Sequence, residues 1–288
     1  MEIGIGLPNA VPDTTGKQIV DWARAAEEAG FNTLGTIDRI VYPSYEPIVA
    51  LSAAAAVTER IRLATDVMLG PLRQNPAMVA KQILSLDALA GGGRAVLGIA
   101  LGGREDDYEI SRIDMSTRGS WLDEALPRIR AIWEGDGDLE AKTGPRPEGD
   151  GPTLLVGGYI EASLERAAEH GHGWTQGGAT PDAFKESVDT LQDAWDRKGR
   201  EGEPYGMALA YYSLGPDAQK NAEHDLKDYY AWLGEETAQA IVDGAAKDAD
   251  TVKQYIAGFE AAGCDELILF PCSPETEQVT LLAEAAGL

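Results

Sequence analysis

Short apolar segments alternate with longer helical segments along this chain. The apolar runs cover residues 3–7, 31–37, 61–69, 95–101, 153–156, 173–176, 207–214 and 266–270. Apolar residues at helical spacing follow each run, at about residues 15–29, 47–58, 76–90, 120–133, 161–170, 181–197, 216–262 and 276–286. Continuous apolar strands are typical of parallel sheets that are covered on both faces and connected by helices. The alternation therefore predicts an α/β fold.

The eight strand and helix units predict a closed (β/α)8 TIM barrel. An open sheet would leave two long edges to cover, and no glycine-rich dinucleotide fingerprint follows the first strand. The length of 288 residues suits a single barrel domain over residues 1–288. Residues 136–152, after the fourth helix, are rich in glycine, proline and charge. We expect them to form an exposed insertion.

The charge of the chain restricts its partners. It has 48 acidic and 24 basic side chains, so its formal net charge is 24 − 48 = −24. Nucleic acid and anionic lipid would be repelled by most of such a surface. The two cysteines, Cys264 and Cys272, suit a reducing compartment, and the opening MEIGIGLPNA has no basic segment before an apolar run. We therefore expect a cytoplasmic protein without a membrane span or a nucleic-acid partner.

Charged residues follow two of the expected strands. In a TIM barrel, ligands bind at the carboxyl ends of the strands, where Asp38 and Arg39 follow the second strand and the sequence GREDDY, with Arg104, follows the fourth. Asp38 and Arg39 could instead form a surface ion pair. The acids of GREDDY could equally be the solvated start of a helix, favoured by its dipole. We take Asp38, Arg39 and Arg104 as candidate catalytic residues.

Two glycine pairs end the fifth and sixth strands, just before helices begin. They are Gly157-Gly158 and Gly177-Gly178. Uncovered backbone amides at a helix start can bind phosphate without a lysine. Glycine pairs also occur as helix stops or tight turns, because glycine readily adopts positive φ angles. Because the two pairs belong to neighbouring strands, we interpret them as a phosphate-binding rim.

Several longer stretches resemble the bacterial luciferase-like flavin-dependent oxidoreductases. They are RIRLATDVMLGPLRQNPAMVAKQILSLDALAGGGRAVLGIALGGREDDYE, RGSWLDEALPRIRAIWEGD, LLVGG and HGWTQGG, so the resemblance extends over nearly the whole chain. It implies a TIM barrel that binds reduced FMN or, alternatively, the deazaflavin coenzyme F-420. The phosphate would lie at the glycine pairs and the ring at the barrel mouth, against Asp66 and Val67. The resemblance also implies a non-proline cis peptide at Asp66-Val67 and an insertion that shapes the substrate pocket.

The resemblance also bears on proton transfer. Deazaflavin-dependent members commonly place an Asp-His pair after the second strand, where this chain has Asp38-Arg39. A guanidinium keeps its proton near neutral pH, so it suits stabilisation of an anionic reduced flavin or a peroxide better than acid-base catalysis. Some members place a glutamate just after the fourth strand, where this chain has Gly103 and Arg104.

Our hypothesis from the sequence is an oxidoreductase. A reduced flavin would serve monooxygenation with dioxygen or hydride transfer to a small organic substrate, and a homodimer is the commonest assembly for such a chain. The alternative is a non-catalytic flavin-binding or partner subunit with the same barrel. A metal-dependent barrel acting on sugar phosphates ranks last, because no cluster of metal ligands is recognisable and we predict no metal site.

Overall fold

Eight parallel strands close into a barrel in the order β1 to β8, with β8 paired to β1. This computed structural model describes residues 1–147, 149, 151–178 and 180–288. The strands are β1 (Glu2–Gly6), β2 (Thr33–Thr36), β3 (Arg62–Leu69), β4 (Ala95–Ala100), β5 (Thr153–Gly157), β6 (Gly173–Gly177), β7 (Tyr205–Tyr212) and β8 (Glu266–Pro271). The predicted (β/α)8 TIM barrel is therefore confirmed.

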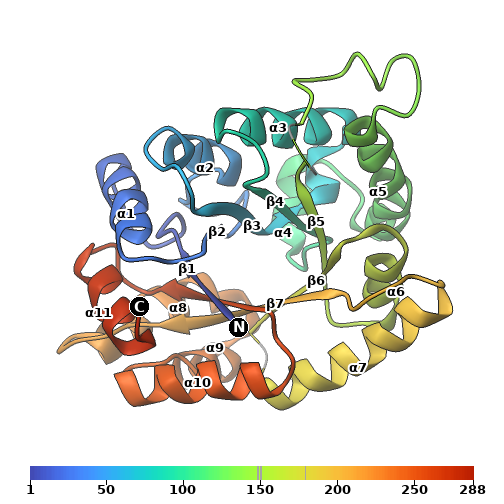
Figure 1. The fold of residues 1–288 in the computed structure, drawn as a ribbon. Coiled ribbons are helices and arrows are strands. Elements are labelled where there is room, and N and C mark those ends of the chain that lie inside the picture. The colour runs from blue at the N-terminus through green and yellow to red at the C-terminus, as the bar shows by residue number, and fades with distance from the viewer. Residues whose placement is uncertain (148, 150, 179) are drawn as a thin grey trace.

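Helices surround the barrel and carry the chain from each strand to the next (Figure 1). They are α1 (Gly16–Glu28), α2 (Pro47–Ala55), α3 (Pro76–Leu89), α4 (Glu105–Ser111), α5 (Arg118–Glu134), α6 (Glu161–His170), α7 (Pro181–Arg197), α8 (Ala218–Tyr229), α9 (Glu235–Asp243), α10 (Ala249–Ala261) and α11 (Glu277–Ala286). The described residues also form short 3-10 turns: η1 (Gly70–Arg73) between β3 and α3, η2 (Met115–Thr117) between α4 and α5, and η3 (Ala231–Leu233) between α8 and α9. The additional helices α4, α8 and α9 follow β4 and β7, so they extend the carboxyl end of the barrel.

Local sequence signals set where the helices begin. Thr15 caps α1 in a reciprocal box with Gln18, in which each side chain accepts from the other residue's backbone N–H. Thr180 caps α7 by accepting from the Ala183 N–H, and Pro181 occupies the first helical position. The α7 helix begins at Pro181, shortly after β6 ends at Gly177.

A polar cluster closes the amino end of the barrel. The guanidinium of Arg62, at the start of β3, lies 2.6 Å from carboxylate oxygens of both Glu2 and Glu266. The Tyr205 hydroxyl accepts a hydrogen bond from the same guanidinium at 2.7 Å. These residues begin β1, β3, β7 and β8, so one arginine bonded to two glutamates and a tyrosine occupies the end at which the strands start.

Strand β3 bulges near its carboxyl end. Its pairing with β4 shifts register between Thr65 and Met68, so Asp66 and Val67 lie outside the regular ladder. The peptide bond between Asp66 and Val67 is cis, as the resemblance implied. Glycine gives Val67 its space, because a Cβ on Gly157 would lie 2.9 Å from a Val67 methyl group.

Residues 135–147, which follow α5, extend outward from the barrel, as the green loop in Figure 1 shows. Lys81 of α3 donates to the Gly144 carbonyl, and Arg146 donates to the Ile132 carbonyl of α5, so Gly144 and Arg146 are held against the two helices. The insertion connects a helix to the following strand, which places it at the amino end of the barrel. Against the expectation that this insertion shapes the substrate pocket, none of its described residues lines the cavity at the carboxyl ends of the strands.

None of the helices in the described part of the chain has the length and apolar character needed to cross a membrane.

Candidate active site

A cavity of about 610 Å³ opens at the carboxyl ends of the strands. This volume lies within the range of small-molecule and cofactor sites in proteins. Its wall is mostly apolar and aromatic, and it contains tyrosines, a tryptophan and a few charged side chains. The sequence-derived candidates among its lining residues are Asp38, Arg39, Asp66, Val67, Arg104, Gly177 and Gly178. The structure therefore brings most of the predicted residues to one cavity.

Much of the cavity wall comes from the long segment between β7 and β8. Tyr229 ends α8 and Tyr230 follows it, Trp232 and Leu233 lie in η3, and Ile241 lies on α9. The tyrosine rings meet edge to face, with centroids 4.9 Å apart. Sequence analysis missed these residues, although the length of the helical stretch at 216–262, after the seventh strand, was a signal that could have found them. The aromatic wall favours a flat or apolar ligand.

Asp38 is buried in the loop after β2. Its Oδ2 atom accepts from the Leu69 N–H at 2.9 Å and from Arg73 at 2.6 Å. Its Oδ1 atom is buried without a hydrogen-bond partner among the described residues. The carboxylate thus has a counter-charge on η1 and one oxygen left for another donor.

Arg39 is also buried, and its partner is a residue far along the chain. Its Nε donates to Asp107 at 2.9 Å, and its Nη2 donates to the Val41 carbonyl at 3.0 Å. The guanidinium carbon lies 5.4 and 5.3 Å from the ring centroids of Tyr42 and Tyr229. Nη1 is buried and makes no hydrogen bond within the described part of the chain. Asp38 and Arg39 therefore each have another partner, and the surface-pair alternative is wrong.

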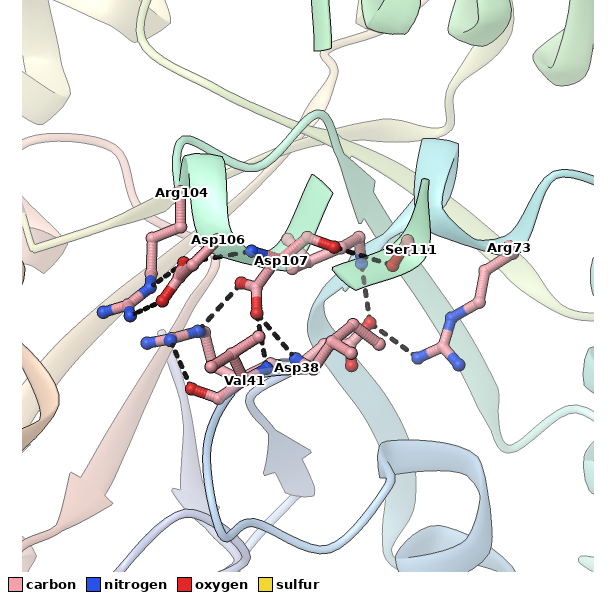
Figure 2. A network of polar contacts seen from close by, with 10 residues as sticks. Asp38, Val41, Arg73, Arg104, Asp106, Asp107 and Ser111 are labelled. Carbon is pink, nitrogen blue, oxygen red and sulfur yellow. Dashed lines mark hydrogen bonds and ion pairs between the residues drawn. The ribbon is translucent and has the colours of Figure 1, made fainter. Parts of the chain in front are cut away.

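Asp107, on α4, holds in place the loop that follows β2 (Figure 2). Its Oδ1 accepts from the backbone N–H groups of Ile40 and Val41 at 3.0 and 2.6 Å, while Oδ2 accepts from Arg39. Asp107 is 1% exposed. Glu105, Asp106 and Asp107 all lie in the first turn of α4, but the interpretation of the GREDDY acids as a solvated helix start fails for Asp107, because it is buried.

Arg104 precedes α4 at the mouth of the cavity. Two of its nitrogens donate to the two carboxylate oxygens of Asp106 (Figure 2). This hydrogen bond raises the pKa of Arg104 and lowers that of Asp106. The guanidinium also lies 5.4 Å from the ring of Trp232. Arg104 therefore links the β4 loop to the wall formed by η3.

Asp66 and Val67 lie at the cavity from the bulge of β3. The Thr175 hydroxyl donates to Asp66 Oδ1 at 2.7 Å, and Oδ2 is buried without a partner in the described residues. Burial raises the pKa of Asp66 to about 6, while the bond from Thr175 opposes the rise and the charge of Glu266 adds to it.

The two glycine pairs occupy different positions. Gly177 and Gly178 line the cavity beside the start of α7, and nothing lies within 4 Å of a Cβ built on Gly178. The Gly178 N–H already donates to the Leu209 carbonyl at 3.2 Å, so the open space rather than this amide is what the glycine offers. Gly157 packs against Val67, and Gly158 accepts from the Trp174 indole at its carbonyl. Neither Gly157 nor Gly158 is a described lining residue of the cavity.

Within residues 1–147, 149, 151–178 and 180–288, no group of three His, Cys, Asp or Glu side chains is arranged to hold a metal ion.

Comparison with known proteins identifies relatives of the chain. An uncharacterized protein of Mycobacterium tuberculosis (strain ATCC 25618 / H37Rv) is 32% identical over 209 residues, which are 62% of this chain and 71% of the relative. The F-420-dependent glucose-6-phosphate dehydrogenase of Amycolatopsis mediterranei (strain U-32) is 27% identical over 180 residues, 56% of this chain and 54% of that enzyme.

Solved structures with the same fold cover the chain more completely. An F-420-dependent secondary alcohol dehydrogenase in complex with an F-420-acetone adduct superposes with a TM-score of 0.82 over 99% of this chain and 97% of that chain, at 19% identity. This likeness shows the shared barrel. The sequence model of the luciferase-like monooxygenase family matches residues 1–264. The chain therefore belongs to the luciferase-like monooxygenase family of oxidoreductases.

Proposed function

We propose that this protein is an oxidoreductase that binds a reduced flavin, FMN or coenzyme F-420, in the cavity at the barrel mouth and acts on a small organic substrate. The observation that carries the proposal is the 610 Å³ cavity, which joins an aromatic wall to an open rim at Gly177 and Gly178. When bound, the cofactor supplies a hydride, or the electrons that activate dioxygen.

The polar atoms at the cavity fit such a cofactor. Arg39 Nη1, Asp38 Oδ1 and Asp66 Oδ2 are buried without partners among the described residues, although their side chains line the cavity. A buried polar group without a partner costs free energy, on the order of 1–3 kcal/mol. A ring system that carries both donors and acceptors would satisfy such atoms, whereas a purely apolar ligand would not.

Each region of the cavity has a role in the proposal. The phosphate end lies in the open space beside Gly177 and Gly178, at the start of α7, and the ring lies against Asp66 and Val67. Arg39 contributes a fixed positive charge that stabilises negative charge on the reduced ring or the substrate. The aromatic side chains of α8 and η3 exclude water and bind the apolar part of the substrate.

Titration of the protein with FMN and F-420, each oxidised and reduced under anaerobic conditions, tests the proposal. We expect saturable binding of one reduced cofactor at micromolar concentration, and weaker binding of riboflavin, which lacks the phosphate. Turnover with carbonyl substrates, with and without dioxygen, then separates hydride transfer from monooxygenation. Tight binding without any turnover would favour the non-catalytic subunit, and no binding of either cofactor would refute the proposal.

A further inference from the structure

Three carboxylates line the cavity among its described residues: Asp38, Asp66 and Asp107. Asp38 is paired with Arg73 at 2.6 Å and Asp107 with Arg39 at 2.9 Å. Asp66 has no cationic side chain within 4.0 Å in the described part of the chain. It is therefore the one of these three acids without a counter-charge.

The environment of Asp66 distinguishes its two carboxyl oxygens. Oδ1 is occupied, because the Thr175 hydroxyl of β6 donates to it at 2.7 Å. Oδ2 is buried and has no partner among the described residues, and the residue as a whole is 5% exposed. A buried carboxylate without a counter-charge is costly, whereas a neutral carboxylic acid in the same position carries a proton that it can donate.

We infer that Asp66 holds a proton on Oδ2 and donates it in a hydrogen bond to an acceptor atom of the cofactor bound in the cavity. This inference rests on the proposed function and assigns Asp66 a chemical role within that site. Thr175 acts as a positioning residue, because its bond to Oδ1 orients the carboxyl group so that Oδ2 is the oxygen left for the ligand.

The titratable groups around Asp66 support this assignment. Burial disfavours ionisation of Asp66 and the negative charge of Glu266 on β8 adds to this effect, so that the pKa of Asp66 rises to about 6. Burial raises the pKa of Tyr159, after β5, and the nearby charge of Asp66 adds to the rise. The phenol stays neutral near neutral pH and brings no cation that would stabilise an Asp66 carboxylate.

The inference predicts a specific pH dependence of cofactor binding. The dissociation constants of reduced FMN and reduced F-420 are measured anaerobically from about pH 5 to about pH 8 for wild type and for Asp66→Asn. The asparagine amide keeps a donor in the place of Oδ2 but cannot lose a proton. The ratio of the two constants therefore cancels the ionisation of the cofactor itself and reports only on Asp66.

We expect wild type and Asp66→Asn to bind about equally well at the acidic end. At the alkaline end we expect wild type to bind at least about tenfold more weakly, because the carboxylate has lost the donated proton. Asp66→Ala should bind weakly at every pH. The ratio of dissociation constants changes around a midpoint pH. Thr175→Val should move this midpoint to higher pH, because the lost hydroxyl stabilised the Asp66 carboxylate.

The possible failures are distinguishable. Cofactor binding by wild type with a ratio that stays flat across the pH range overturns the inference alone. A Thr175→Val midpoint that moves to lower pH also overturns it. Absence of binding by folded wild type at every pH overturns the proposed function, and the inference with it. Thermal unfolding of each variant shows whether it is folded, and Thr175→Val provides the second test if Asp66→Ala does not fold.

Discussion

Arg39 and Asp107 form a buried ion pair at 2.9 Å, although 68 positions separate them in the sequence. Asp107 also accepts from two consecutive backbone N–H groups, at Ile40 and Val41. One carboxylate on a short helix after β4 therefore fixes the loop that follows β2. Two neighbouring loops of the barrel mouth are thereby joined into one unit.

Replacing Asp107 should destabilise the fold. Asp107→Ala leaves the Arg39 charge buried without its counter-charge and two backbone donors without an acceptor, which we expect to cost about 3–5 kcal/mol. Urea unfolding measures this cost as a change in the free energy of unfolding. Glu109→Gln, an exposed change on the same helix, should stay within about 0.5 kcal/mol of wild type. Equal effects of the two changes would contradict the role given to Asp107.

Adding a methyl group at Gly178 should weaken cofactor binding beyond its effect on folding. Gly178 and Gly199 have nearly the same positive φ, +66° and +68°, and both have open space around a built Cβ. Gly178→Ala and Gly199→Ala should therefore each cost about 1 kcal/mol of unfolding free energy. Only Gly178 lines the cavity, so only its variant should raise the dissociation constant of the phosphate-bearing cofactor. A matching rise in Gly199→Ala would argue against a phosphate end at this rim.

A side chain at Gly157 should displace Val67, which lines the cavity. The Cβ of Gly157→Ala would lie 2.9 Å from a Val67 methyl and 3.1 Å from the Ala100 Cβ. Such overpacking costs about 1–3 kcal/mol. We also expect weaker cofactor binding, because Val67 must move toward the cavity. Restored binding in the double variant that adds Val67→Ala would support an effect transmitted by Val67. Unchanged binding in Gly157→Ala alone would contradict it.

Stability should depend on pH through Asp66 even without a cofactor. The pKa of Asp66 is raised to about 6 in the folded protein from 3.8, so the folded state binds the proton more tightly than the unfolded state. The stability from this proton is fully present below about pH 4 and is lost as pH rises to about 6. The shift of about 2 units corresponds to about 3 kcal/mol.

Asp66→Asn removes this dependence. The unfolding free energy of the variant relative to wild type should therefore increase from about pH 4 to about pH 6 and stay level above that, as urea unfolding at several pH values will show. A relative stability that does not change between these pH values would mean that Asp66 ionises normally in the folded protein.

The sequence predicted the architecture better than the site. Continuous apolar strands and helical periodicity are local signals, and they were sufficient for the eight strands and for a cavity at their carboxyl ends. The 136–152 insertion was expected at the substrate pocket, yet none of its described residues lines the cavity. Its composition indicates exposure but not the end of the barrel. Its place between a helix and the next strand carried that information.

The burial of charged residues was harder to predict. Asp107 lies in a run of acids that looks like a solvated helix start, and its burial depends on Arg39, Ile40 and Val41 from a distant loop. Asp38 and Arg39 are adjacent in sequence, which suggested a mutual ion pair, yet each pairs with another residue. Such partnerships depend on three-dimensional contacts that no spacing in the sequence encodes.

The pairing of arginines at the mouth has a kinetic consequence. Arg39, Arg73 and Arg104 are each matched by an aspartate, so this group of arginines brings no excess positive charge to a chain whose formal charge is −24. A phosphate-bearing molecule approaching from solution is therefore repelled over long distances and attracted only on contact. Added salt screens that repulsion, so association should become faster with ionic strength, the reverse of what electrostatic steering produces.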